Sequence, residues 1–244
     1  MAVFISEDYR IFMIQKNIAN QNVTIHRFDT VIIGAGAAGM NCAKKLYEFL
    51  DNKGIKDAAS QIAVVTRGLP LGASRMSGSD KQTYYKMGTS PDIADSAESF
   101  AASLTAAGCC HGDLALVEAI GSLHGFYNLV EAGVPFLHDS MGTYIGYKTD
   151  HDPYERATSA GPKTSKFMSQ CLEKIVRRYG IEIFDSKEVA EFLTSGKGGN
   201  KRIIGVVTID AKSISEKDFA INVFYFNNLV LAAGGPGELY ETSV

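Results

Sequence analysis

The chain has 244 residues, of which 45% are hydrophobic and 21% are charged, as in an ordinary globular protein that buries a core. Its formal net charge of −3 excludes the basic surplus with which proteins hold a nucleic-acid backbone. No apolar run approaches the roughly 20 residues that span a bilayer, and the first 21 residues lack a secretory signal pattern. The four cysteines show no metal or disulfide spacing. These features favour a cytoplasmic protein with free thiols and no membrane span.

The first regular pattern is a strand, a helix and a second strand. Residues 1–28 are a leader with short β-like stretches, and residues 29–33 form a short apolar run typical of a buried parallel strand. Glycine-rich residues 34–39 follow, and apolar residues then recur at helical spacing to residue 50. Residues 61–66 supply the next strand, which completes a βαβ unit.

The middle of the chain is predicted to be mostly helical. Ser90-Pro91 indicates the start of one helix, as an N-cap followed by a first helical proline. A second helix begins after Asp113 and ends near Gly133. Its apolar residues at helical spacing are Leu116, Ile120, Leu123, Tyr127 and Val130. Residues 134–165 are polar and are interpreted as a long irregular segment.

The last third of the chain indicates a helix and then several strands. Residues 165–179 are helical, with Gly180 as the stop. The strands are expected at residues 181–184, 188–194, 202–210, about 220–226 and 229–231. The sequence therefore predicts an α/β fold: a Rossmann-like parallel sheet with helices, plus an antiparallel β-meander.

Gly34, Gly36 and Gly39 form a GxGxxG pattern between a strand and a helix, the context that a dinucleotide-binding loop requires. The first glycine permits a tight turn, the second lets the backbone approach a pyrophosphate, and the third allows close helix–strand packing. The phosphates would rest on unpaired N–H groups at the helix N-terminus. A standard NAD site places an acid at the end of the second strand, whereas Thr66-Arg67 stands there in this chain.

Further segments point to one family. After Thr66-Arg67 come residues 72–78 (GASRMSG), residues 132–136 (AGVPF), the meander, and residues 231–240 (LAAGGPGELY). Together they resemble the flavoprotein subunits of succinate dehydrogenase and fumarate reductase and soluble relatives such as L-aspartate oxidase. The resemblance covers residues 29–244 and implies an FAD-binding domain there. Members of this family often carry a Ser/Thr-Lys/Arg pair at the end of the second strand, so the resemblance also implies that Thr66-Arg67 should stand in place of an acid.

The resemblance implies which residues bind FAD. These residues would contact the pyrophosphate, the ribose, the adenine or the flavin ring of the cofactor. They are Gly34, Gly36, Ala37, Ala38, Gly39, Thr66, Arg67, Gly72, Ser74, Ser77, Gly78, Val189, Ala190, Ala232, Ala233 and Gly234. Ala73 stands where membrane-bound members carry a histidine bonded to FAD, so non-covalent FAD is expected. Ser77-Gly78-Ser79-Asp80 departs from the family's flavin loop, which puts that contact in doubt.

The same resemblance implies an FAD-dependent oxidoreductase that moves a hydride between flavin and a small carboxylate. The family's capping domain would follow residue 244, so the chain is expected to be a truncated portion that has no turnover of its own and binds FAD poorly or not at all. No catalytic residue is assigned. Lys148, His151 and Arg156 are candidates because they gather in one reactive segment, and no metal ligands are predicted.

The partners implied are a small anionic substrate and an electron-transfer partner, without nucleic acid. Two alternatives stay open. The first is another flavoenzyme, either an amino-acid oxidase like L-aspartate oxidase or a ketosteroid dehydrogenase. The second is a non-catalytic module that binds nucleotides or other subunits.

Overall fold

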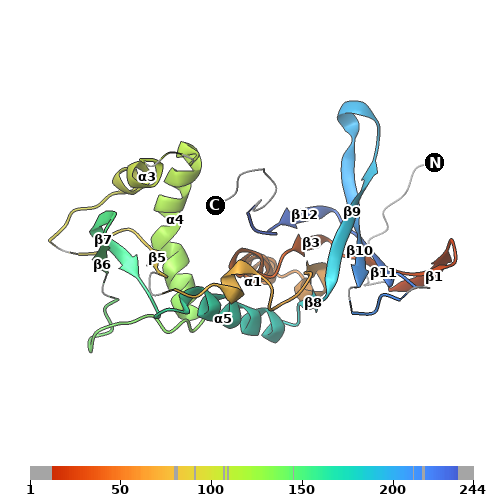
Figure 1. Cartoon of the computed structure of the whole chain (residues 1–244), viewed down its shortest axis with the longest axis horizontal. Helices are drawn as coiled ribbons and strands as arrows, with labels where there is room; N and C mark the ends of the chain where they lie inside the picture. The colour runs from red at the N-terminus through yellow and green to blue at the C-terminus, as the bar shows by residue number, and fades with distance from the viewer. Residues whose placement is uncertain are drawn as a thin grey trace. The chain divides into compact units, whose positions relative to one another are not determined.

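The computed structural model describes residues 13–79, 82–90, 92–106, 108, 110–144, 146–210, 212–215 and 218–235. Contacts divide the chain into two compact units (Figure 1): unit 1 is Met1–Met76 with Leu172–Val244, and unit 2 is Ser77–Cys171. The start of the leader, Asp80, Pro91, Cys109 and the end of the last family-like motif lie outside the described residues.

Unit 1 contains a four-stranded parallel sheet in the order β12-β3-β4-β8. Its strands are β3 (Thr30–Ile33), β4 (Ile62–Val65), β8 (Glu182–Phe184) and β12 (Asn228–Leu231). Every residue of β3 and β4 is buried, as expected for central parallel strands covered on both faces. The predicted Rossmann-like sheet is confirmed.

Helices connect these strands. α1 (Ala37–Asn52) joins β3 to β4 and buries Gly39, Met40 and Ala43, which confirms the βαβ unit. The short η1 (Ala58–Gln61) and α2 (Ala73–Met76) lie in the connections before and after β4. α5 (Thr164–Arg178) precedes β8 at the predicted place. None of the helices in the described part of the chain has both the length and the apolar character needed to cross a bilayer.

A second sheet of unit 1 contains the meander, in the order β1-β2-β11-β10-β9. It is built from β1 (Ile14–Ile18), β2 (Gln21–Arg27), β9 (Lys187–Ser195), β10 (Arg202–Asp210) and β11 (Ile221–Tyr225). β9, β10 and β11 are antiparallel, as predicted, and β2 adds to β11 in parallel. The hairpin of β9 and β10, with η2 (Gly198–Asn200) in its turn, projects away from the other strands (Figure 1).

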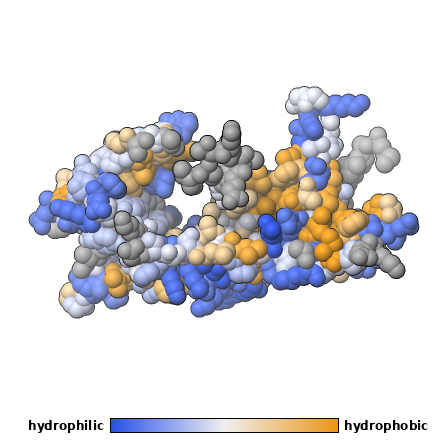
Figure 2. Space-filling model, in the orientation of Figure 1, coloured by the Kyte–Doolittle hydropathy of each residue, from blue (hydrophilic) through white to orange (hydrophobic). Residues whose placement is uncertain are grey.

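The core of unit 1 takes residues from both sheets. Its buried members are Phe28, Val31, Ile33, Ala63, Val65, Val206, Phe224 and Phe226. Because β3 and β4 supply half of them and the meander strands supply others, the two sheets share one apolar core. Figure 2 shows that apolar residues also gather at the surface over the strands of this unit.

His26 is a polar member of this core. Its ring stacks on Phe224 with centroids 4.6 Å apart and meets Phe184 edge-on at 4.8 Å. Its Nε2 lies 3.1 Å from Oδ1 of Asn222. Burial lowers the pKa of His26 below its ordinary value of 6.5, and the Asn222 hydrogen bond and the charge of Glu182 offset this only in part.

The stability of unit 1 is therefore expected to fall with acidification. Because the folded-state pKa is the lower one, the unfolded chain binds the proton more readily, so this contribution is complete above pH 6.5 and is lost as the pH falls below it. His26→Gln should cost roughly 1–2 kcal/mol at pH 7.5 but should flatten the dependence between pH 7.5 and 5.5. Urea unfolding across that range is the measurement, and identical slopes for both proteins would contradict the assignment.

Among the described residues, unit 2 contains two whole helices, the first part of α5 and a small sheet. The helices are α3 (Ala97–Thr105) and α4 (Gly112–Glu131), and the strands β5 (Tyr84–Tyr85), β6 (Tyr147–Thr149) and β7 (Asp152–Thr158) have the order β5-β7-β6. The prediction that residues 134–165 are irregular was wrong over β6 and β7. The strand β7 was not predicted because its charged residues suggested a solvated loop, whereas Asp152 and Arg156 are buried and form an ion pair with each other.

The predicted start of the first helix was also wrong. α3 begins after Ser96, whose side-chain oxygen accepts a hydrogen bond from the amide of Ser99 at 3.1 Å. Asp95 in turn accepts from the amides of Gly88 and Ser96. These hydrogen bonds keep the backbone before Ala97 out of the helical conformation, so the helix starts at Ala97 with Ser96 as its N-cap.

The apolar set picked out on the second helix is not the buried face of α4. The buried side chains are Ala115, Ala119, Ser122, Phe126, Asn128 and Leu129. By contrast, Leu116, Ile120 and Tyr127 are exposed. The buried face contains Ala115, Ala119 and Ser122, which contribute little hydrophobicity, so a search for large apolar residues selects a neighbouring stripe of the helix instead.

Candidate functional site

The glycine loop between β3 and α1 has two positions that no other residue fits. Gly34 has a φ of +109°, and a Cβ there would lie 2.1 Å from the carbonyl oxygen of Ala232. A Cβ on Gly39 would lie 1.9 Å from the carbonyl oxygen of Gly34. These contacts bring the loop, α1 and the end of β12 together, in the tight packing that the spacing predicts.

Gly36 is different because its surroundings are open. It is the N-cap of α1, with φ −72° and ψ −176°, and within the described residues no side chain caps the helix from that position. Among the described atoms, a Cβ at Gly36 would meet Oγ of Ser74 alone within 4 Å, at 3.3 Å. Ser74 Oγ accepts a hydrogen bond from the amide of Ala37 at 3.1 Å, so α2 is tied to the start of α1.

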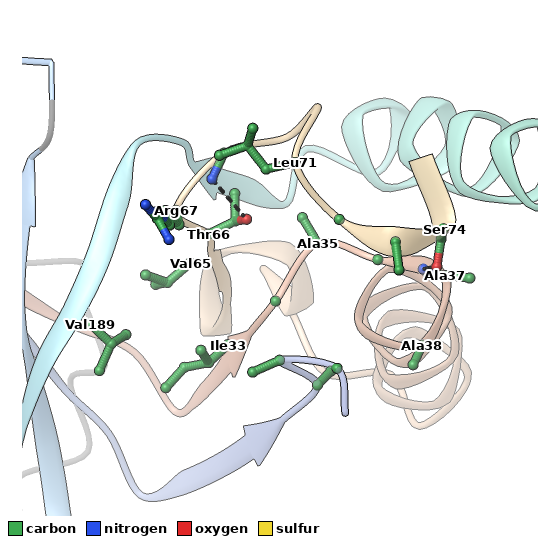
Figure 3. A pocket seen from close by; sticks show the side chains of 18 of the residues that line it. Ile33, Ala35, Ala37, Ala38, Val65, Thr66, Arg67, Leu71, Ser74 and Val189 are labelled. Atoms are coloured by element: carbon green, nitrogen blue, oxygen red, sulfur yellow. Dashed lines mark hydrogen bonds between the residues drawn. The ribbon is translucent and has the colours of Figure 1, made fainter. Parts of the chain in front are cut away.

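A cavity of about 650 Å³ opens in front of this helix end. In Figure 3, Ala37 and Ser74 lie on one side of it and Thr66 and Arg67 on the other. Its walls contain these predicted residues: Gly34, Gly36, Ala37, Ala38, Thr66, Arg67, Gly72, Ser74, Val189, Ala232, Ala233 and Gly234. It also contains Ile33, Ala35, Val65, Gly68, Leu71, Ala73 and Lys187, which the sequence prediction did not include.

Four predicted residues do not line the cavity. Gly39 lies behind the loop, where it serves packing. Ala190 follows Val189 on β9, and neighbouring residues of a strand point to opposite faces. Ser77 and Gly78 belong to unit 2, where the amide of Ser79 donates to the carbonyl of Pro162 at 3.0 Å.

The two cations on the cavity wall are already paired. Lys187 forms an ion pair with Asp210. The Arg67 Nε lies 3.5 Å from a carboxylate oxygen of Glu188, in an exposed pair. The electrostatic attraction for an anion is therefore left mainly to the positive end of α1 and the amides of its first turn.

The wall that contains Thr66, Gly68 and Leu71 is held from outside the cavity. The amide of Gly68 donates to Oγ1 of Thr66 at 3.3 Å, and the amide of Leu69 donates to Oδ1 of Asp185 at 2.9 Å. Burial raises the pKa of Asp185, but the hydrogen bonds from Leu69 and from Lys212 outweigh it and hold that pKa below its ordinary value. Asp185 lies 116 positions from Leu69, so no sequence spacing indicates the contact.

The cavity fits the adenosine diphosphate half of FAD. Small residues and glycine leave space at the helix end, and the backbone donors of the first turn suit a pyrophosphate. Apolar side chains such as Val65, Leu71 and Val189 suit a flat aromatic ring. The residues present therefore match the group that the glycine pattern indicates.

The three catalytic candidates lie on the β6–β7 hairpin of unit 2 and differ in environment. Lys148 and His151 are exposed. Arg156 is 1% exposed and ion-paired with Asp95 and Asp152. The structure therefore places Arg156 in the interior and the other two on the surface.

Comparisons with known proteins agree with this geometry. A family model described as an FAD binding domain matches residues 29–243. The chain is 25% identical over 230 residues to L-aspartate oxidase of Pseudomonas aeruginosa, which covers 88% of this chain and 38% of that protein.

Solved structures share the fold. Quinol fumarate reductase FrdA of E. coli superposes with a TM-score of 0.69 at 20% identity, over 88% of this chain and 34% of that one. Sdh1 of Mycobacterium smegmatis gives 0.66 at 21% identity, over 87% and 35%. The chain thus spans little more than a third of the length of the proteins it matches.

Proposed function

The chain belongs to the FAD-binding domain family, and from this we propose that it holds the adenosine diphosphate half of FAD in a flavin-dependent oxidoreductase. The observation that carries the proposal is the N-terminus of α1, which opens onto the cavity because Gly36 places no side chain in front of it. When bound, FAD supplies the hydride chemistry, and the protein supplies position and electrostatics.

The pyrophosphate would lie at the positive end of the α1 dipole, against the first-turn residues that line the cavity, Ala37 and Ala38. The ribose and adenine would lie between the Thr66–Gly68 wall and the residues around Val189 and Ala233. Because no acid stands at the end of β4, Thr66 and backbone groups would contact the ribose.

The activity of the whole enzyme is a proposal that rests on its relatives. Fumarate reductase and L-aspartate oxidase both have names that indicate small carboxylates, so we propose a small anionic substrate and a separate electron donor or acceptor. The L-aspartate oxidase match, made by sequence, favours an amino-acid oxidase as the second candidate. A cytoplasmic location remains a prediction.

Among the catalytic candidates, we assign Arg156 to the interior network of unit 2. Its donors are taken up by Asp95, Asp152 and two serines, which leaves it no role in binding a substrate. Lys148 and His151 stay candidates for contacts with an anion, because both are exposed.

The purified chain is expected to bind FAD and ADP weakly, and FMN more weakly still, because FMN lacks the adenosine half. Binding is measured by flavin fluorescence and by calorimetry, and FAD should leave the protein entirely on acid precipitation because Ala73 offers no atom for a covalent bond. FMN binding as tight as FAD binding would contradict the assignment of the cavity. Yellow colour retained by the washed pellet would contradict the non-covalent attachment.

A further inference from the structure

One face of α4 carries a row of exposed side chains at regular spacing. Val117 is 67% exposed, Ile120 is 61% exposed and Tyr127 is 51% exposed. His124 lies between them and is also exposed. We call the row Asp113, Val117, Ile120, His124, Tyr127 and Glu131 the α4 seam.

The α4 seam lies away from the buried face of its helix, although the Tyr127 ring makes edge contacts with Phe126 and Tyr144. The buried residues of α4, Ala115, Ala119, Ser122, Phe126 and Leu129, lie on the opposite side of the helix. Apolar side chains left in water over such a length indicate a surface that binds another protein. The exposed Leu114 and Leu116 flank the seam and widen it.

The spacing identifies the shape of the partner. The seam residues are separated by four, three, four, three and four positions, which is the 3.5-residue repeat of a coiled-coil interface. A surface with that repeat fits a second helix that crosses at a shallow angle. The partner segment should therefore be an amphipathic helix with apolar residues at the same repeat.

The charges identify the partner's chemistry. The seam starts at Asp113 and ends at Glu131, and residues 87–147 contain no lysine or arginine. Asp113 also stabilises the N-terminal end of its helix, but Glu131 lies in the last turn, where a negative charge opposes the helix dipole. Helix stability therefore does not account for Glu131.

A second copy of this chain is a poor partner for the seam. An antiparallel pair of α4 helices would set Asp113 against Glu131 at both ends, and a parallel pair would set each acid against itself. Like charges in register disfavour both arrangements. A partner with lysine or arginine at those positions would be attracted instead.

We propose that the α4 seam binds an amphipathic helix of another protein, whose apolar residues follow the 3-4 repeat and whose flanking residues are lysine or arginine. All seam residues belong to unit 2, so the proposal does not depend on FAD binding in unit 1.

The test uses two synthetic helical peptides with the same leucine face at a 3-4 repeat, one flanked by lysine and the other by glutamate. Fluorescence anisotropy with the full 244-residue chain should show the lysine peptide binding at least roughly tenfold more tightly than the glutamate peptide. Ile120→Asp should weaken the lysine peptide by a similar factor. Glu131→Lys should reduce the difference between the peptides.

Leu137→Asp is the matched control, because Leu137 is 71% exposed in the same unit but lies outside the seam. It should leave both affinities unchanged, and circular dichroism should show all variants folded. Equal binding of the two peptides, or lysine-peptide binding that Ile120→Asp does not change, would overturn the proposal. If sedimentation equilibrium showed a dimer of the chain that Ile120→Asp dissociates, the seam would bind a second copy of this chain and the proposal of a basic partner helix would be wrong.

Discussion

Arg156→Met is expected to lower the free energy of unfolding of unit 2 by about 3–5 kcal/mol, since it leaves buried carboxylates without their counter-charge. The guanidinium is 1% exposed, and each of its five N–H donors has an acceptor. Nε and Nη2 donate to Asp95 at 2.8 and 2.6 Å, and Nη1 donates to Asp152 at 3.0 Å. The other two donors go to Ser99 and Ser103.

The network also connects elements that are distant in sequence. Asp95 precedes α3, and Asp152 begins β7. The Arg156 guanidinium lies 4.5 Å from the ring centroid of Phe100 and 4.2 Å from that of Tyr154. One substitution therefore removes the ion pairs with Asp95 and Asp152, the hydrogen bonds to Ser99 and Ser103, and two cation–π contacts at once.

Urea unfolding of the full chain measures the effect. Arg177→Met is the matched control, because Arg177 forms an i,i+4 pair with Glu173 but its side chain is 53% exposed, and its loss should cost less than about 0.5 kcal/mol. Adding Asp95→Asn to Arg156→Met should recover part of the lost stability by removing an unpaired charge. A loss below about 1 kcal/mol for Arg156→Met would return Arg156 to the catalytic candidates.

Gly36→Val is expected to weaken the affinity for FAD and for ADP by roughly 100-fold or more while the chain stays folded. The backbone of Gly36 is extended, a conformation that any residue adopts, and a Cβ there would approach only the side-chain oxygen of Ser74 among the described atoms, at 3.3 Å, so the chain is expected to fold with a side chain at this position. That side chain would occupy the space in front of the α1 amides, where the pyrophosphate would lie. Fluorescence and calorimetric titrations give the affinities, with circular dichroism as the folding control.

Two further glycines make this test specific. Gly199→Val alters a position where a Cβ would have no described atom within 4 Å, on the turn of the β9–β10 hairpin, and should leave affinity unchanged. Gly34→Val should instead disrupt the fold, because its side chain would collide with the backbone of Ala232. If Gly36→Val bound FAD with the affinity of the unmodified chain, the glycine loop would connect β3 to α1 without binding the pyrophosphate.

The fold of unit 1 could be predicted because its signals are local. Short apolar runs such as residues 30–33 and 62–65 become fully buried parallel strands. Gly34, Gly36 and Gly39 stand at a fixed spacing because the turn, the ligand and the helix packing each require a residue without a side chain. This loop supplies Gly34, Gly36, Ala37 and Ala38 of the predicted cavity wall, and the segments that resemble the family supply the other predicted residues.

Unit 2 was harder to predict because its organisation depends on distant contacts. Arg156 finds its main partner 61 positions away, so its charges looked like those of a solvated loop. On α4 the buried face mixes Phe126 and Leu129 with small residues such as Ala115 and Ala119, while several large apolar residues are exposed, so hydrophobicity alone selects the wrong face. Asp185 likewise supports the cavity wall through a contact across 116 positions.

The central claim is that the amides at the start of α1 bind the pyrophosphate of FAD. A titration of the ¹⁵N-labelled chain with ADP, followed by amide chemical shifts, tests it most directly. The account predicts that the largest changes fall on Ala37 and Ala38, with further changes at Thr66–Gly68 and Ala232–Gly234, and that Gly36→Val removes them at the same ADP concentration. Changes confined to unit 2, or saturable binding that leaves the α1 amides unshifted, would contradict it.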